Sequence, residues 1–192
     1  KPILENPHIE KIGQNLKYDM LVFRSAGDVR LAGVTFDTMV ASYLLEAGQR
    51  AHSLDELAKR YLNRPTIRIE ELIGSGKKQK RMDQVPVERI AEYAGDHALL
   101  PLQLRPILSK QIQEQQLQEL LVELELPLVE VLAEMEYTGV RIDVEFLSRL
   151  SQRYAEKMQA LEAEIHQLAG RQFNIASPKQ LQEVLFDQLK LH

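Results

Sequence analysis

The chain has 192 residues and a formal net charge of −4, from 24 basic and 28 acidic side chains. It contains no cysteine, which excludes disulfides, thiolate zinc sites and cysteine nucleophiles. No apolar run approaches the roughly eighteen residues that a membrane helix needs. The first residues also lack the pattern of a signal peptide, so we expect a cytoplasmic protein.

The charge is distributed unevenly along the chain. Residues 1–110 carry 17 basic and 14 acidic side chains, whereas residues 111–192 carry 7 and 14. A free-standing nucleic-acid-binding domain is usually basic. If DNA is the partner, contact must therefore come from local patches rather than from the overall field.

The first 45 residues alternate between strand and helix patterns. We expect the end of a strand at 11–13, a helix over 16–25, a short strand over 29–34, and a helix capped by Asp37 or Thr38 that runs through Leu45. This alternation predicts an α/β domain.

The next segment combines one well-capped helix with a basic loop. Ser53 and Glu56 form a capping box that opens a helix through about Asn63. A Gly-rich basic loop follows at 74–81. Pro86 suits the first turn of another helix. Two further prolines interrupt that helix pattern, and each costs roughly 3 kcal/mol inside a straight helix. The pattern therefore predicts a kink or a break near residues 97–106.

From residue 111 onward the pattern is almost purely helical. Asp143 begins a long amphipathic helix that Gly170 closes. Ser177, followed by Pro178, forms a second capping box and opens a short helix through Leu189. The change of pattern and the change of charge both indicate a domain boundary near residue 110.

Asp19 is the first candidate for chemistry. It follows Asn15 by one helical turn, just after a predicted strand, so its carboxylate can point into the crevice above a sheet. Two-metal nucleases hold Mg²⁺ or Mn²⁺ with several such carboxylates from different elements. On spacing alone, Asp19 is equally compatible with a solvated residue at a helix start.

Five segments in unbroken order resemble the bacterial family A DNA polymerases. They are residues 13–19, 36–45, 52–58, 125–132 together with 139–143, and 173–186. The resemblance implies a segment of a longer polymerase chain, running from inside a 3′–5′ exonuclease-like domain into the thumb that grips DNA. It implies an α/β fold for residues 1–110, as part of a ribonuclease H-like exonuclease domain. Residues 111–192 would be all-α and form connecting helices and a portion of the thumb.

The sequence departs from this family at the exonuclease metal site. The first exonuclease motif, Asp-x-Glu, is not found in these residues. In the third motif Tyr93 matches the family's Tyr, but His97 stands where an Asp is expected. Histidine is a poor substitute because Mg²⁺ prefers oxygen ligands. Tyr93 and His97 also fit a packed aromatic and a partly exposed imidazole. Asp19 is then the one remaining carboxylate, and we expect no metal and no nuclease activity here.

Two groups of residues are candidates for DNA contact. The resemblance implies that the segment around Asn174, Ser177, Lys179 and Gln180 approaches the minor-groove side of a primer–template duplex. A capped helix N-terminus beside a lysine suits a phosphate, although the same pattern describes any well-capped helix. The second group is the basic loop, which equally fits a solvated surface. Its basic residues are Lys77, Lys78, Lys80 and Arg81.

The parent protein implied by the resemblance is a DNA-directed DNA polymerase, a nucleotidyltransferase of replication and repair that uses Mg²⁺. Its transfer chemistry would lie outside these residues. Its partners would be a primer–template duplex, bound weakly and without sequence preference by this piece, and the rest of the polymerase chain. We expect it in the bacterial cytoplasm, associated with the nucleoid. Two alternatives remain: a stand-alone 3′–5′ exonuclease-superfamily protein and a non-enzymatic helical interaction module.

Overall fold

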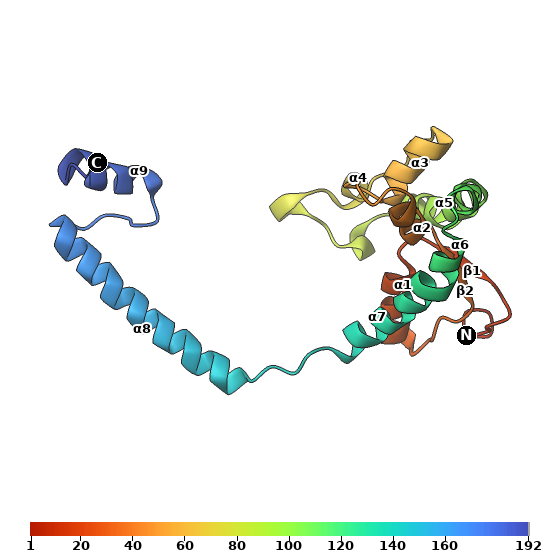
Figure 1. Ribbon diagram of the computed structural model, residues 1–192, viewed down its shortest axis with the longest axis horizontal. Coiled ribbons are helices and arrows are strands. Elements are labelled where there is room, and N and C mark those ends of the chain that lie inside the picture. Colours follow the sequence, from red (N-terminus) through yellow and green to blue (C-terminus); the bar gives the residue numbers. More distant parts are fainter. Residues whose placement is uncertain (192) are drawn as a thin grey trace. The chain divides into compact units, whose positions relative to one another are not determined.

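A computed structural model describes residues 1–191, except for the side chain of Lys78. The chain divides into two compact units, Lys1–Gly139 and a second that begins at Val140. Each is described by itself (Figure 1). In the described part of the chain, no helix is both long enough and apolar enough to cross a membrane.

The first unit combines a small parallel sheet with helices. Its elements are β1 (Lys11–Gly13), α1 (Leu16–Gly27), β2 (Val34–Asp37), α2 (Thr38–Leu45), α3 (Leu54–Leu62), α4 (Ile69–Ile73), η1 (Gly76–Lys78), η2 (Met82–Gln84), α5 (Val87–Glu114), α6 (Gln118–Leu120), η3 (Leu121–Glu125) and α7 (Leu126–Thr138). The two strands pair in parallel, with Ile12 opposite Phe36 and Gly13 opposite Asp37. Helix α1 connects them, which is the βαβ arrangement expected of an α/β domain.

The strand predicted over residues 29–34 is wrong in position. Residues 29–33 are irregular, and the second strand is Val34–Asp37, which shares only Val34 with the predicted range. The burial of Phe36, which is 4% exposed, places this strand in the main core beside α2, α3 and α5. The apolar side chains of residues 29–34 are only partly buried. Tertiary packing therefore decided which of two neighbouring apolar segments pairs with β1.

Helix α5 continues through both prolines, so of the kink or break predicted near residues 97–106 the break is wrong, and the kink stays a prediction. One stripe of this helix is fully buried, with Leu100, Leu104, Leu108 and Ile112 all 0% exposed. Four such side chains contribute about 6–12 kcal/mol by burial. Two helix prolines cost about 6 kcal/mol together. The core contact along this stripe is therefore large enough to hold the helix together.

The second unit is entirely helical. It contains α8 (Val144–Ala169), α9 (Pro178–Gln182) and the π-helical turn η4 (Glu183–Gln188). Helix α8 begins directly after Asp143, as predicted, and the Asp143 side chain caps it by accepting a hydrogen bond from Phe146 N at 2.8 Å. Gly170 ends the helix in the left-handed region, with φ 67°. The fold class is thus α/β followed by an all-α segment, as predicted.

Candidate metal and nucleic-acid sites

Asp19 lies on α1, directly after β1, and is half-buried. Asn15, which precedes the helix, has left-handed backbone angles (φ 57°) and no side-chain capping bond. Burial raises the pKa of Asp19, and the nearby charge of Asp37 raises it further. The two carboxyl groups therefore lie close enough to repel one another.

Asp37 is almost fully buried and is bonded on both oxygens. Its Oδ1 accepts hydrogen bonds from Asn15 N at 3.1 Å, Met39 N at 2.9 Å and Val40 N at 3.4 Å. Its Oδ2 accepts one from Leu16 N at 2.7 Å. Burial raises its pKa against the opposing effect of these donors. Of the two caps predicted for α2, Asp37 or Thr38, Asp37 is therefore the one that forms, and it also anchors the first turn of α1.

Tyr93 and His97 stack on each other, with ring centroids 4.1 Å apart. Both lie on α5. The charge of Asp55 on α3 acts on both rings, and Asp96, which acts on His97, is paired with Arg64. Burial lowers the pKa of His97, although Asp55 and Asp96 act in the opposite direction. Burial likewise raises the pKa of Tyr93.

These side chains do not fit a divalent metal ion. Mg²⁺ needs near-octahedral oxygen coordination. Asp37 already uses both oxygens for backbone donors, and Asp19 is the carboxylate beside it. Among the described residues, no hydrogen bond or ion pair joins Asp19 to Tyr93 or His97. Nor does any group of three or more His, Cys, Asp or Glu side chains in that part of the chain have the geometry of a metal site.

The four residues predicted to approach DNA, Asn174, Ser177, Lys179 and Gln180, come together where the chain enters α9. Asn174 N donates to Gln180 Oε1 at 2.8 Å, and Asn174 Oδ1 accepts from Ala176 N at 3.0 Å. Ser177 Oγ accepts from Gln180 N at 3.4 Å, which confirms the predicted cap. Lys179 is exposed beside this turn. Three of the four side chains thus shape the turn, and Lys179 supplies the positive charge.

The described side chains of the basic loop, residues 74–81, are exposed. The loop contains the short 3₁₀ turn η1, and the 3₁₀ turn η2 follows it. Lys77 and Lys80 point to solvent. Arg81 is paired with Asp83 at 2.8 Å, which neutralises part of the positive charge. The side chain of Lys78 lies outside the described residues. The loop belongs to the first unit, Lys1–Gly139.

The negative charge of the second half lies in one segment. Residues 111–139 contain seven Glu and no basic residue, whereas residues 140–192 carry seven of each sign. The unit that contains Lys179 is therefore electrically balanced. The acidic segment ends in α7, where two of the glutamates bind basic side chains of α1.

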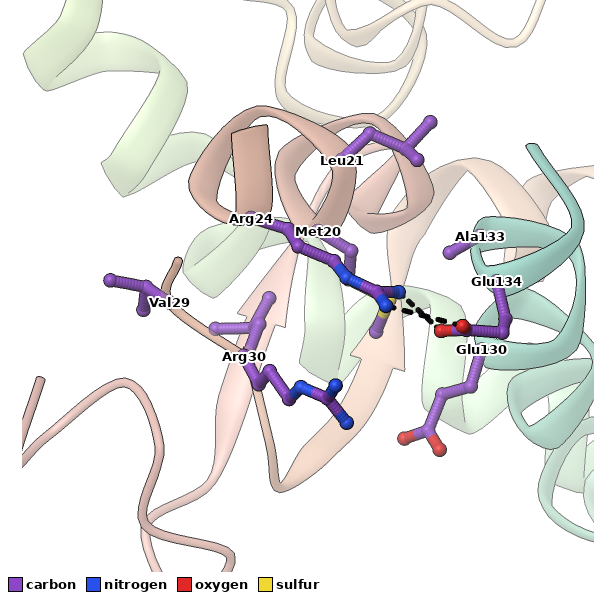
Figure 2. A pocket seen from close by; sticks show the side chains of 9 residues that line it. Met20, Leu21, Arg24, Val29, Arg30, Glu130, Ala133 and Glu134 are labelled. Atoms are coloured by element: carbon purple, nitrogen blue, oxygen red, sulfur yellow. Dashed lines mark hydrogen bonds and ion pairs between the residues drawn. The ribbon is translucent and has the colours of Figure 1, made fainter. Parts of the chain in front are cut away.

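Helix α7 is held on α1 by a group of contacts that sequence analysis did not anticipate (Figure 2). The Arg24 guanidinium donates hydrogen bonds to both carboxylate oxygens of Glu134, from Nη1 to Oε2 and from Nη2 to Oε1, the latter at 3.2 Å. The guanidinium carbon of Arg24 also lies 3.6 Å from the centroid of the Tyr137 ring. Lys17 pairs with Glu136. The Glu134 hydrogen bond raises the pKa of Arg24 and lowers that of Glu134. A cleft of ≈ 170 Å³ adjoins these residues. The partners are more than 100 positions apart, so no local pattern could reveal them.

Two family models match the chain in succession. The model described as 3′-5′ exonuclease matches residues 1–113, and the model described as DNA polymerase family A matches residues 144–192. The chain belongs to DNA polymerase family A. The resemblance inferred from the five sequence segments is thereby confirmed.

Relatives match over the full length of the chain. DNA polymerase I of Pseudomonas aeruginosa is 41% identical over 193 aligned residues, which cover 100% of this chain and 21% of that protein. DNA polymerase I of Chloroflexus aurantiacus is 42% identical, over 98% of this chain and 20% of the relative. The chain thus spans about a fifth of the length of these curated relatives.

Solved structures agree with this assignment. The POL domain of Pol1 from M. smegmatis, in complex with a DNA primer-template and dNTP, matches 98% of this chain with a TM-score of 0.77 and 31% identity, over 30% of that structure's chain. Brucella melitensis NrnC matches 72% of this chain and 63% of its own, with a TM-score of 0.61 and 20% identity, and so shares the fold alone.

Proposed function

We propose that these residues are part of a Mg²⁺-dependent, DNA-directed DNA polymerase that acts in replication and repair. The observation that carries the proposal is the unbroken order of the two family matches, exonuclease followed by polymerase, along one chain. Nucleotidyl transfer takes place in parts of the parent protein other than these residues. A cytoplasmic, nucleoid-associated location follows from that role.

Within this segment the proposed division is an exonuclease-like platform in residues 1–110, then connecting helices and thumb in residues 111–192. The β1–α1–β2 arrangement supports the first assignment. The packing of α7 on α1 through Arg24 and Glu134 supports a connecting role, because it fixes the segment that leads to the polymerase part.

The platform serves as a scaffold rather than as a nuclease. Asp19 is the carboxylate that a remnant metal site retains, Tyr93 is its remnant aromatic, and His97 replaces the expected acid. The saturation of Asp37 by four backbone N–H groups supports this proposal, since it leaves Asp19 without a second free carboxylate. One carboxylate cannot hold the two metal ions that such nucleases use.

The second unit contacts the backbone of a primer–template duplex. The exposed side chain of Lys179, beside the turn formed by Asn174, Ser177 and Gln180, supports a phosphate contact without base recognition. The DNA primer-template in the M. smegmatis complex is consistent with such a partner. The basic loop is a second candidate for contact.

The scaffold role is tested by incubating 3′-labelled single-stranded DNA with the chain and Mg²⁺ or Mn²⁺. We expect no trimming by the wild type, by Asp19→Ala or by His97→Asp. Trimming by the wild type that disappears in Asp19→Ala would show a working nuclease and end the scaffold proposal. The polymerase proposal, which rests on the family matches, would survive that result.

A further inference from the structure

The segment that leads from α8 to α9 is bonded back to the last turn of α8. His166 Nε2 lies 2.9 Å from Phe173 O, and the two rings meet edge to face with their centroids 5.5 Å apart. A carbonyl oxygen can only accept a hydrogen bond, so Nε2 of His166 carries a hydrogen and donates it. Both residues are partly buried and belong to the second unit, so the contact does not depend on the first.

This hydrogen bond fixes one side of a single peptide group. The C=O of Phe173 and the N–H of Asn174 belong to the same planar unit and, in its trans form, point in opposite directions. On the other side, Asn174 N donates to Gln180 Oε1 at 2.8 Å. The peptide group is thus held between the last turn of α8, through His166, and the first turn of α9, through Gln180. We call these four residues the peptide clamp.

Separate contacts hold the chain that follows the peptide clamp. Gln188 Nε2 donates to Ala169 O at 2.5 Å, which ties the end of η4 to the end of α8. Ala169 and Val184 are the two apolar side chains that the described part of the second unit buries almost completely. None of these contacts involves His166. Loss of its side chain should therefore loosen the turn before α9 without unfolding the unit.

We propose that His166 is a positioning residue for the phosphate contact of Lys179, an inference that rests on the DNA-binding role proposed for the second unit. Lys179 directly precedes Gln180 on α9, so the peptide clamp also sets where the Lys179 side chain begins. A lysine is a point charge on a flexible stem, and it engages a phosphate only when its backbone is held within reach. With the peptide clamp open, α9 can pivot about residues 170–173, and Lys179 neutralises a phosphate for a smaller share of the time.

Two replacements separate the hydrogen-bond donor of His166 from its ring. His166→Gln keeps an N–H donor close to the position of Nε2 but removes the ring. His166→Phe keeps an aromatic ring beside Phe173 but has no donor. A packing role would be fulfilled by phenylalanine, whereas the positioning role needs the donor and should be restored by glutamine.

Amide hydrogen exchange at Asn174, followed by NMR, tests the peptide clamp without DNA. Loss of one hydrogen bond changes the opening equilibrium by about 2- to 10-fold. We expect exchange at Asn174 to be faster by that factor in His166→Phe and unchanged in His166→Gln. Far-UV circular dichroism should show the same helix content in all three proteins. Equal exchange in all three overturns the peptide clamp and with it the positioning role.

The salt dependence of primer–template binding tests the positioning role itself. Lys179→Ala is introduced into the wild type, into His166→Gln and into His166→Phe. We expect it to reduce the log–log salt slope by about 0.9 in the first two backgrounds, and by less than about half of that in His166→Phe. An equal reduction in all three backgrounds overturns the positioning role and leaves the phosphate contact intact. No reduction in any background overturns the phosphate contact, and the positioning role with it.

Discussion

The replacement Asp37→Ala should destabilise the first unit far more than loss of an ordinary helix cap. The wild-type carboxylate accepts four backbone hydrogen bonds, two from the start of α2 and two from Asn15 and Leu16 at the start of α1. Loss of an N-cap costs about 0.5–2 kcal/mol. Each buried donor left without a partner costs about 1–3 kcal/mol more. Relief of the buried charge offsets part of this, and we expect a net loss of about 2–4 kcal/mol.

Urea unfolding followed by far-UV circular dichroism measures this loss, with thermal unfolding beside it. A change of this size lowers the melting temperature by about 5–15 °C in a unit of this length. Ser53→Ala is the matched control, because Ser53 is exposed and accepts a single bond from Glu56 N at 3.5 Å. It should cost no more than about 1 kcal/mol. Equal losses for Asp37→Ala and Ser53→Ala would refute the double-anchor role of Asp37.

Three further predictions follow from the contacts described above. Burial holds the pKa of His97 below its ordinary value of 6.5. Near that pH the folded state therefore binds fewer protons than the unfolded chain. The stability that is present above pH 6.5 is lost as the pH falls through the pKa of the folded state. Urea midpoints measured between about pH 8 and pH 5 should fall less steeply in His97→Gln than in the wild type. Arg24→Ala should speed amide hydrogen exchange along α7. The control Lys110→Ala removes an exposed ion pair within α5 and should leave exchange in α7 unchanged. Equal exchange rates in the two variants would mean that the Arg24 contacts are dispensable. Titrating a labelled primer–template at several salt concentrations should show weak binding, and Lys179→Ala should reduce the log–log salt slope by about 0.9 without altering sequence preference. A slope that changes with Lys77→Ala instead would move the contact to the basic loop.

Local chemistry in the sequence predicted the helix boundaries well. Ser53 and Ser177 were predicted as caps, Asp37 as one of two alternative caps, and Asp143 as a helix start. Each of these four side chains accepts a backbone hydrogen bond at the start of its helix. Helix caps can be recognised in a sequence because the capping side chain and the backbone N–H group that it binds lie within three residues of each other. The helix end at Gly170 was also predicted correctly, because a helix-ending glycine is likewise a local signal.

Features that depend on distant residues could not be predicted in the same way. The persistence of α5 through Pro101 and Pro106 reflects burial of a stripe against the rest of the core. The second role of Asp37 depends on Asn15 and Leu16, more than twenty positions away, which only the parallel pairing of β1 and β2 brings close. Sequence patterns indicated each participant but not the contact between them.

The family motifs identified candidate residues without giving their surroundings. Asp19 and His97 were both predicted as remnants of one metal site. The structure instead surrounds them differently, Asp19 beside Asp37 and His97 beside Tyr93 and Asp55. Which carboxylates remain free to bind an ion depends on backbone donors, and those donors become visible only in the folded chain.

The central claim is that the exonuclease-like platform holds no catalytic metal. Titration of the chain with Mn²⁺, followed by electron paramagnetic resonance, tests it most directly, because bound and free Mn²⁺ give different signals. We predict only weak, non-specific binding, with the same isotherm for the wild type and for Asp19→Ala. A tight site in the wild type that Asp19→Ala abolishes would contradict the claim.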